Sequence, residues 1–173
     1  EYSTSLLDEQ GQPVFSGSNG LFGLTGEEVR PLAPSRAKSG DPLYAQFIDR
    51  AGVLWFTGLL RAGSQRLWRG VEERFPVGHR IAEGRFSPMY EDREGNLWFG
   101  SWTQGLARLS DGPLVSFSMT EGLSSDAART LLEDASGAIW VGTTNGLNRI
   151  AHGRIDAFRR PRDFDEARDL NWV

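Results

Sequence analysis

The segment Asp134-Ala135-Ser136-Gly137-Ala138-Ile139-Trp140-Val141 decides the fold class, because copies of it recur along the chain at a nearly constant interval. The pattern Asp-x-x-Gly-x-(Leu or Ile)-Trp-(Phe or Val) is shared by residues 49–56, 92–99 and 134–141. The tryptophans of these copies stand 43 and 42 residues apart. A fainter copy at residues 8–15 carries Val14 in the place of the tryptophan. A constant period of this length indicates a repeat architecture.

Each unit is predicted to form four short strands. In the last copy the predicted strands are residues 128–133, 138–142, 146–150 and 154–158. Asp134 and Gly137 bound the first turn, where an aspartate accepts backbone N–H groups and a glycine tolerates a positive φ. A four-stranded sheet cannot cover both of its faces alone, so stacked copies must bury them. A period of about 40–45 residues with four strands per unit is typical of a propeller blade.

We therefore predict an all-β fold, a β-propeller segment of about four blades with four antiparallel strands in each. The predicted repeats are residues 1–42, 43–85, 86–126 and 127–160, and residues 161–173 form a linker or the start of a further strand. Three arrangements stay open: a four-bladed ring, part of a larger ring, or two chains that complete an eight-bladed ring. Because exposed blade faces drive association, we expect either closure by this chain alone or a homodimer.

The repeats resemble a known family. Residues 133–147, and likewise 91–106, resemble the two-component regulator propeller repeat, and residues 121–126 resemble the linker between its blades. The resemblance covers residues 43–160 well and residues 1–42 poorly, since the first copy lacks the tryptophan and the repeat arginine. In that family the repeats build the extracytoplasmic sensor of bacterial membrane receptors, with a histidine kinase or a diguanylate cyclase as the output module.

The resemblance implies a non-catalytic, ligand-recognising propeller of a transmembrane receptor, in the periplasm or otherwise outside the cytoplasm, attached to the inner membrane through segments outside this sequence. The alternative is a scaffold for protein–protein interaction or dimerisation without a small ligand, and a propeller lyase or hydrolase ranks below both. The chain begins at Glu1 without methionine, so we expect a processed or excised piece. The expected ligand is a small molecule, with a sugar or a peptide as the candidate classes, and no cofactor is expected.

The composition excludes several other classes of function. There are 23 acidic and 19 basic residues, a net charge of −4, without the basic field that nucleic-acid binding requires. Cysteine is absent, which removes disulfides, thiolate zinc sites and cysteine nucleophiles. The two histidines, His79 and His152, stand in separate loops, so no metal site is expected.

The residues at the repeat positions are predicted to be structural: Trp55, Trp98, Trp140, Asp49, Asp92, Asp134, Gly52, Gly95 and Gly137. The tryptophans should pack between blades, and the aspartates and glycines should form turns. Three further repeat positions carry arginine, namely Arg66, Arg108 and Arg149. We expect these arginines to pair with carboxylates of neighbouring blades, with Glu91 and Glu133 as the candidate partners.

Loops that differ between copies are the better candidates for binding, because function concentrates in loops on a rigid scaffold. The loops between second and third strands contain four residues suited to a ligand: Arg61, Trp102, Gln104 and Asn145. Trp102 has no counterpart in the other copies, and an exposed tryptophan beside polar groups suits stacking on a sugar or a peptide. We predict the ligand site at these residues.

Overall fold

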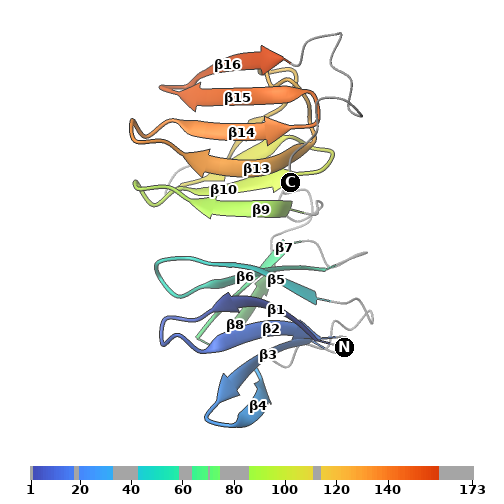
Figure 1. Cartoon of the computed structure of the whole chain (residues 1–173), viewed down its shortest axis with the longest axis vertical. Helices are drawn as coiled ribbons and strands as arrows, with labels where there is room; N and C mark the ends of the chain where they lie inside the picture. The colour runs from blue at the N-terminus through green and yellow to red at the C-terminus, as the bar shows by residue number, and fades with distance from the viewer. Residues whose placement is uncertain are drawn as a thin grey trace, which may run out of the picture.

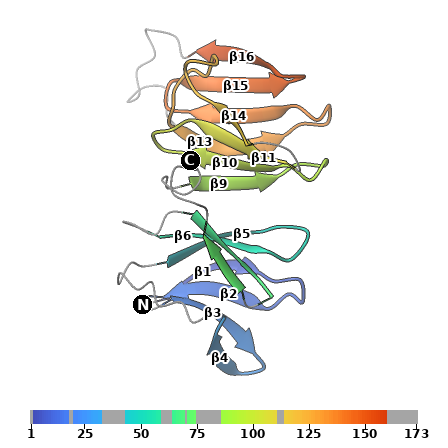
Figure 2. The same ribbon diagram turned by 180° about the vertical axis from the view of Figure 1, so that it is seen from behind.

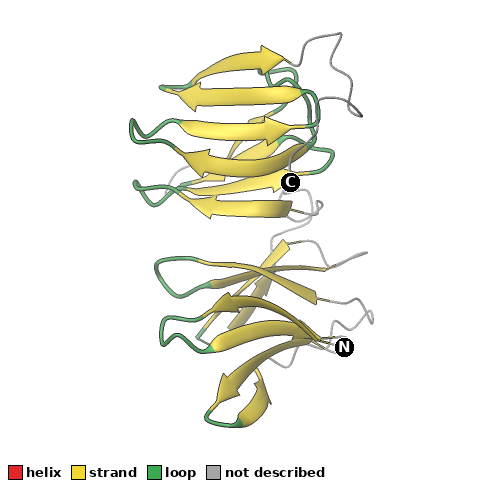
Figure 3. Ribbon diagram, in the orientation of Figure 1, coloured by secondary structure: helices red, strands yellow, loops and turns green. Residues whose placement is uncertain are grey.

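The computed structural model describes residues 2–17, 20–32, 43–58, 64–69, 71–74, 86–110 and 114–159. Within these residues all regular secondary structure is strand, as Figure 3 shows. Sixteen strands form four antiparallel sheets, each built from four consecutive strands. The predicted all-β fold with four strands per unit is confirmed. This part of the chain contains no helix that could span a membrane.

The strands follow one another in each sheet in chain order. The first sheet contains β1 (Tyr2–Leu7), β2 (Pro13–Gly17), β3 (Gly20–Thr25) and β4 (Glu28–Pro31). The second contains β5 (Leu43–Ile48), β6 (Leu54–Gly58), β7 (Ser64–Trp68) and β8 (Val71–Arg74). The third contains β9 (Phe86–Glu91), β10 (Leu97–Ser101), β11 (Leu106–Leu109) and β12 (Val115–Phe117). The fourth contains β13 (Ala128–Glu133), β14 (Ile139–Thr143), β15 (Gly146–Ala151) and β16 (Arg154–Arg159).

The turn between the first two strands has the same construction in all four sheets. In the fourth sheet Asp134 Oδ1 accepts hydrogen bonds from the backbone N–H groups of Ser136 and Ala138, at 2.8 and 3.1 Å. Gly137 donates its N–H to the carbonyl of Asp134 and has a φ of 82°, in the left-handed region that favours glycine. The faint first copy forms the same turn with Asp8 and Gly11, so the first sheet shares this construction with the other three.

In the second, third and fourth sheets the remaining oxygen of the turn aspartate accepts a hydrogen bond from a tryptophan. The indole Nε1 of Trp55, Trp98 and Trp140 donates to Oδ2 of Asp49, Asp92 and Asp134, at 2.8, 2.7 and 2.7 Å. One carboxylate therefore fixes both the turn and the side chain that fills the space beside the next sheet. Sequence reasoning assigned these aspartates to the turn and missed the indole as their second partner.

The sheets stack in chain order, and three apolar clusters fill the three interfaces between them. Every interface joins two different faces. We call the face that carries the tryptophan position the tryptophan face, and the other side of the same sheet the opposite face. Between the second and third sheets, Trp55 packs edge-on against Phe99 with ring centroids 5.2 Å apart. Trp98 lies in the cluster between the third and fourth sheets.

The stack is open. Figures 1 and 2 show the first sheet (blue) and the fourth sheet (red) at its two ends. The described strands therefore do not close into a ring by themselves, which was the first of the two outcomes expected from the sequence. The end faces remain uncovered: Phe117 is 8 % exposed in the third sheet, whereas its counterpart Phe158 is 53 % exposed in the fourth.

The expected partners of the repeat arginines were wrong. Glu91 and Glu133 do bridge neighbouring sheets, but they accept from turn arginines: the backbone N–H of Arg50 donates to Glu91 at 2.7 Å, and that of Arg93 to Glu133 at 3.1 Å. The guanidinium Nε of each of these arginines lies 3.7 Å from the same carboxylate. The turn of one blade projects towards the end of the next first strand, whereas the repeat arginines lie mid-strand.

The repeat arginines instead stay within their own blades. Arg66 pairs with Glu73 at 2.6 Å, and Arg149 Nε lies 3.8 Å from Asp134 Oδ2. The Arg108 guanidinium lies 5.7 Å from the centroid of the Trp98 ring, a cation–π distance.

Replacing Trp98 with alanine should lower the free energy of unfolding by about 3–5 kcal/mol, because it empties a buried interface between two sheets. The matched control is Trp140→Ala, which removes the same ring and the same aspartate hydrogen bond at the half-buried end face. Denaturant unfolding at a concentration where the chain is monomeric should show a clearly smaller loss for Trp140→Ala. Equal losses would mean that the contribution of Trp98 to the free energy of unfolding does not come from the stacking of the third and fourth sheets.

Asp134 should make the stability depend on acidic pH. Hydrogen bonds from the Ser136 hydroxyl and then the Trp140 indole hold the pKa of Asp134 well below its ordinary value. The unfolded chain, with a pKa of about 3.9, binds this proton more readily, so the stabilisation is complete above about pH 5 and is lost as pH falls. Between pH 5 and 2 the free energy of unfolding should fall less in Asp134→Asn than in the wild type. Ser136→Ala should lie between them, and an unchanged slope in Asp134→Asn would contradict this assignment.

Candidate functional site

Trp102 forms an exposed aromatic platform in the loop between β10 and β11. Its side chain is 57 % exposed, and the Arg129 guanidinium of the next sheet lies 4.0 Å from the ring centroid. Arg129 is the extra residue of a β-bulge, because Ala128 pairs with Thr143 whereas Thr130 pairs with Gly142. The bulge thus supplies a cation beside the platform, and sequence reasoning did not identify Arg129.

Gln104 follows in the same loop with an unsatisfied polar atom. Its backbone N–H donates to Ser101 Oγ at 3.1 Å, which holds the loop in a tight bend. Its side-chain oxygen Oε1 is buried and has no hydrogen-bond partner among the described residues. A buried acceptor without a donor costs free energy, so a ligand or water that donates to it would be favoured.

The linker 118–127 connects this loop to the corresponding loop of the fourth sheet. Gly105 N donates to the Asp126 carbonyl at 2.8 Å, and Thr144 N donates to the Ala127 carbonyl at 3.3 Å. Asn145, next in that loop, is exposed and donates its backbone N–H to Thr143 Oγ1 at 3.3 Å. Trp102, Gln104 and Asn145 therefore lie in two loops tied to one linker, which we call the loop face. The fourth predicted residue, Arg61, lies outside the described residues.

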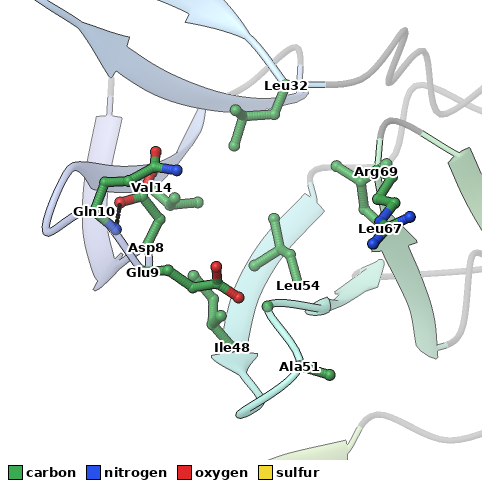
Figure 4. Close-up of a pocket in the computed structure, with 11 residues that line it drawn as sticks. Asp8, Glu9, Gln10, Val14, Leu32, Ile48, Ala51, Leu54, Leu67 and Arg69 are labelled. Carbon is green, nitrogen blue, oxygen red and sulfur yellow. Dashed lines mark hydrogen bonds between the residues drawn. The ribbon is translucent and has the colours of Figure 1, made fainter.

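A cavity of about 600 Å³ separates the first and second sheets (Figure 4). Its apolar walls come from both sheets, with Val14 and Leu32 on one side and Leu54 and Leu67 on the other. Asp8, Glu9, Gln10 and Arg69 place charged and polar groups around the same space. A volume of this size is in the range of small-molecule sites.

The cavity occurs where the first blade departs from its repeat. The equivalent space between the third and fourth sheets is about 310 Å³ and contains Trp98, Arg108 and Phe117, whose indole and phenyl rings stack 5.7 Å apart. By register, the first blade has smaller residues at those positions: Val14, Gly23 and Leu32. Three reductions in side-chain size at one place leave about twice the volume open.

The charges around the cavity also depart from the repeat. Glu9 stands where the second and third blades carry Arg50 and Arg93, and Ile48 stands where the next blades carry Glu91 and Glu133. The arginine–glutamate bridge of the other interfaces is therefore missing here. A Cβ added to Gly52 would overlap Glu9 Oε1, so the Glu9 carboxyl group lies directly on the turn of the second sheet.

Nothing in the described residues gathers groups for metal chemistry. No cluster of three or more His, Asp or Glu side chains suited to a metal ion is found there. His152 lies in the exposed turn before β16 with a φ of 50°, and His79 lies outside the described residues. Asp49, Asp92 and Asp134 each accept hydrogen bonds from their own turn and tryptophan.

Comparison with known proteins agrees with the resemblance noted from the sequence. Residues 82–103 and 122–145 match the model of the family described as two component regulator propeller. The two matched stretches lie mainly in the third and fourth copies of the repeat, and the resemblance is confirmed. No curated protein matches the chain in sequence.

Solved structures share its fold. The extracellular domain of the one-component system BT4673 from B. thetaiotaomicron is 21 % identical with a TM-score of 0.72, over 92 % of this chain and 22 % of that one. The extracellular domain of the hybrid two-component system BT3049 from the same organism is 18 % identical with a TM-score of 0.69, over 90 % and 22 %. Virginiamycin B lyase from Staphylococcus aureus is 15 % identical with a TM-score of 0.69, over 94 % and 61 %. At these identities the likeness shows the propeller fold alone, and the chain spans less than two thirds of each of these structures.

Proposed function

We propose that this chain is the ligand-recognising part of a propeller sensor in a bacterial transmembrane receptor, with a histidine kinase or a diguanylate cyclase as its output. The observation that carries the proposal is the match of two repeats to the two-component regulator propeller. The likeness of the fold to extracellular domains of one- and two-component systems supports it. The same likeness supports a place outside the cytoplasm, in the periplasm, with attachment to the inner membrane through segments beyond this sequence.

The loop face is the proposed recognition surface. Trp102 and Arg129 offer a stacking platform with a cation, and Gln104, two residues after Trp102 in the same loop, offers a buried acceptor. A sugar ring or a peptide presents both a flat or apolar surface and N–H or O–H donors, which this arrangement matches. Binding changes signalling only if the ligand has different affinities for two states of the receptor.

Catalysis is not part of this proposal. A lyase or hydrolase needs an acid or a base at the reacting group, held in position by a partner. The exposed turn position of His152 and the commitment of Asp49, Asp92 and Asp134 to turns favour recognition over chemistry. Lyase neighbours share the propeller, and a shared fold by itself does not transfer an activity.

A thermal-shift screen with sugars and peptides should identify ligands that raise the melting temperature as their concentration rises. At a ligand concentration of one hundred times Kd, the free energy of unfolding should increase by about 2.7 kcal/mol. Trp102→Ala should abolish the shift without lowering the stability of the free protein, since Trp102 is exposed. Val71→Ala, an equally exposed site away from both the loop face and the two end faces, is the matched control. A ligand whose shift survives Trp102→Ala would remove the loop face as its site.

The two end faces favour dimerisation as a second role. The fourth sheet ends on its tryptophan face, where Leu147 is 43 % exposed while its counterpart Leu106 in the third sheet is buried. The first sheet ends on its opposite face, with exposed Leu7 and Val29 beside the stacked rings of Phe15 and Phe22. Every internal interface joins a tryptophan face to an opposite face, so a second copy offers the complementary face at each end. We propose a head-to-tail homodimer, a ring of eight blades, which is within the range of propellers.

Sedimentation should show a dimer whose population rises with concentration. Leu147→Glu and Val29→Glu, each tested alone, should both give monomers, because each change damages both contacts of a symmetric head-to-tail pair. Mixing the two variants should restore dimers, since one undamaged contact then forms between unlike copies. A wild-type monomer at all concentrations would contradict the proposal, as would a Val29→Glu protein that still dimerises.

A further inference from the structure

We propose that the cavity between the first and second sheets binds an indole, or another flat heteroaromatic molecule with a ring N–H, in the place that a tryptophan side chain fills in the other blades. The proposal is separate from ligand recognition at the loop face, because the two places share no residue. It assigns a small-molecule site to an interface between blades.

The acceptor for the ring N–H is already in position. In the other three blades one aspartate oxygen binds the turn, and the second accepts an indole N–H at 2.7–2.8 Å. Asp8 has the same arrangement at the turn, because its Oδ1 accepts from Gln10 N and Gln12 N at 2.9 and 2.8 Å. Val14 provides no indole, and among the described residues no donor reaches Asp8 Oδ2. This oxygen is held by its turn in the orientation that binds an indole elsewhere.

The space beside this acceptor matches a flat ring. The wider cavity results from Val14, Gly23 and Leu32 at positions that carry Trp98, Arg108 and Phe117 in the third blade. Leu32 folds over Gly23, since a Cβ there would lie 2.8 Å from Leu32 Cδ2, yet about 600 Å³ stays open. The apolar walls would cover the faces of a small aromatic molecule, and the polar groups at the rim would meet its edge.

Larger side chains of the second sheet fill only the deep part of its interface with the first sheet. Leu43 and Phe56 are larger than their counterparts in the fourth sheet, Ala128 and Val141, and they pack in the same cluster as Val14. The turn end is left open, where Ile48, Leu54 and Leu67 form the apolar wall. The vacant volume therefore lies next to Asp8, where a ring N–H would need it.

The experiment titrates the intact chain with indole by isothermal titration calorimetry. Indole should bind with a Kd below about 1 mM. 1-Methylindole, which lacks the N–H, should bind about tenfold more weakly, since a hydrogen bond to a charged acceptor is lost. Asp8→Asn should weaken the binding of indole by a similar factor and leave the binding of 1-methylindole unchanged. The asparagine Oδ1 still accepts hydrogen bonds from the turn, whereas its Nδ2 takes the place of the oxygen that would accept the indole N–H.

Val14→Trp tests the location by placing the missing side chain in the cavity. This variant should lose indole binding and melt at a higher temperature. Val71→Trp, an exposed site of the second sheet that does not line the cavity, is the matched control and should bind indole as the wild type does. If Val14→Trp does not fold, Asp8→Asn decides.

Three results would overturn the proposal: no indole binding at millimolar concentration, equal affinity of indole and 1-methylindole, or unchanged binding in Val14→Trp. None of them would bear on the loop face, whose test depends on Trp102.

Discussion

Every sheet in this chain has two apolar faces, and only another sheet can cover them. The turn aspartate makes that cover specific, because a single carboxylate closes the hairpin through two backbone N–H groups and aims an indole at the neighbouring sheet. Loss of the aspartate would therefore disturb both the hairpin and the interface. The order of the four sheets, the clusters between them and the two uncovered ends all follow from this requirement.

The fold could be predicted from the sequence, but only part of the candidate functional site could be. The spacing of Trp55, Trp98 and Trp140 predicted the blades, and the strands of the last copy agree with the structure to within one residue at every end. The indole hydrogen bond and the Arg50 to Glu91 bridge were missed, because each depends on which way a turn projects once two sheets are stacked. Val14 was visible as a weak match to the repeat. Its meaning as a vacant volume required the register that also places Gly23 and Leu32 beside it.

The loop face and the cavity show two ways in which one blade of a repeat protein can differ from the other blades. At the loop face a blade gains residues that its neighbours lack, such as Trp102 and the bulged Arg129. In the cavity a blade has smaller residues than its neighbours, and the shared framework around the loss remains in place. Both departures leave the repeat intact, since the turns on either side keep their aspartate and their glycine.

The pairing of a tryptophan face with an opposite face at every interface has a consequence for how such chains diversify. Because each unit presents one face of each kind, the duplication or deletion of a whole unit leaves a neighbouring pair that still fits. The number of units in such a stack can therefore change by whole blades, while each new pair of neighbours still joins a tryptophan face to an opposite face.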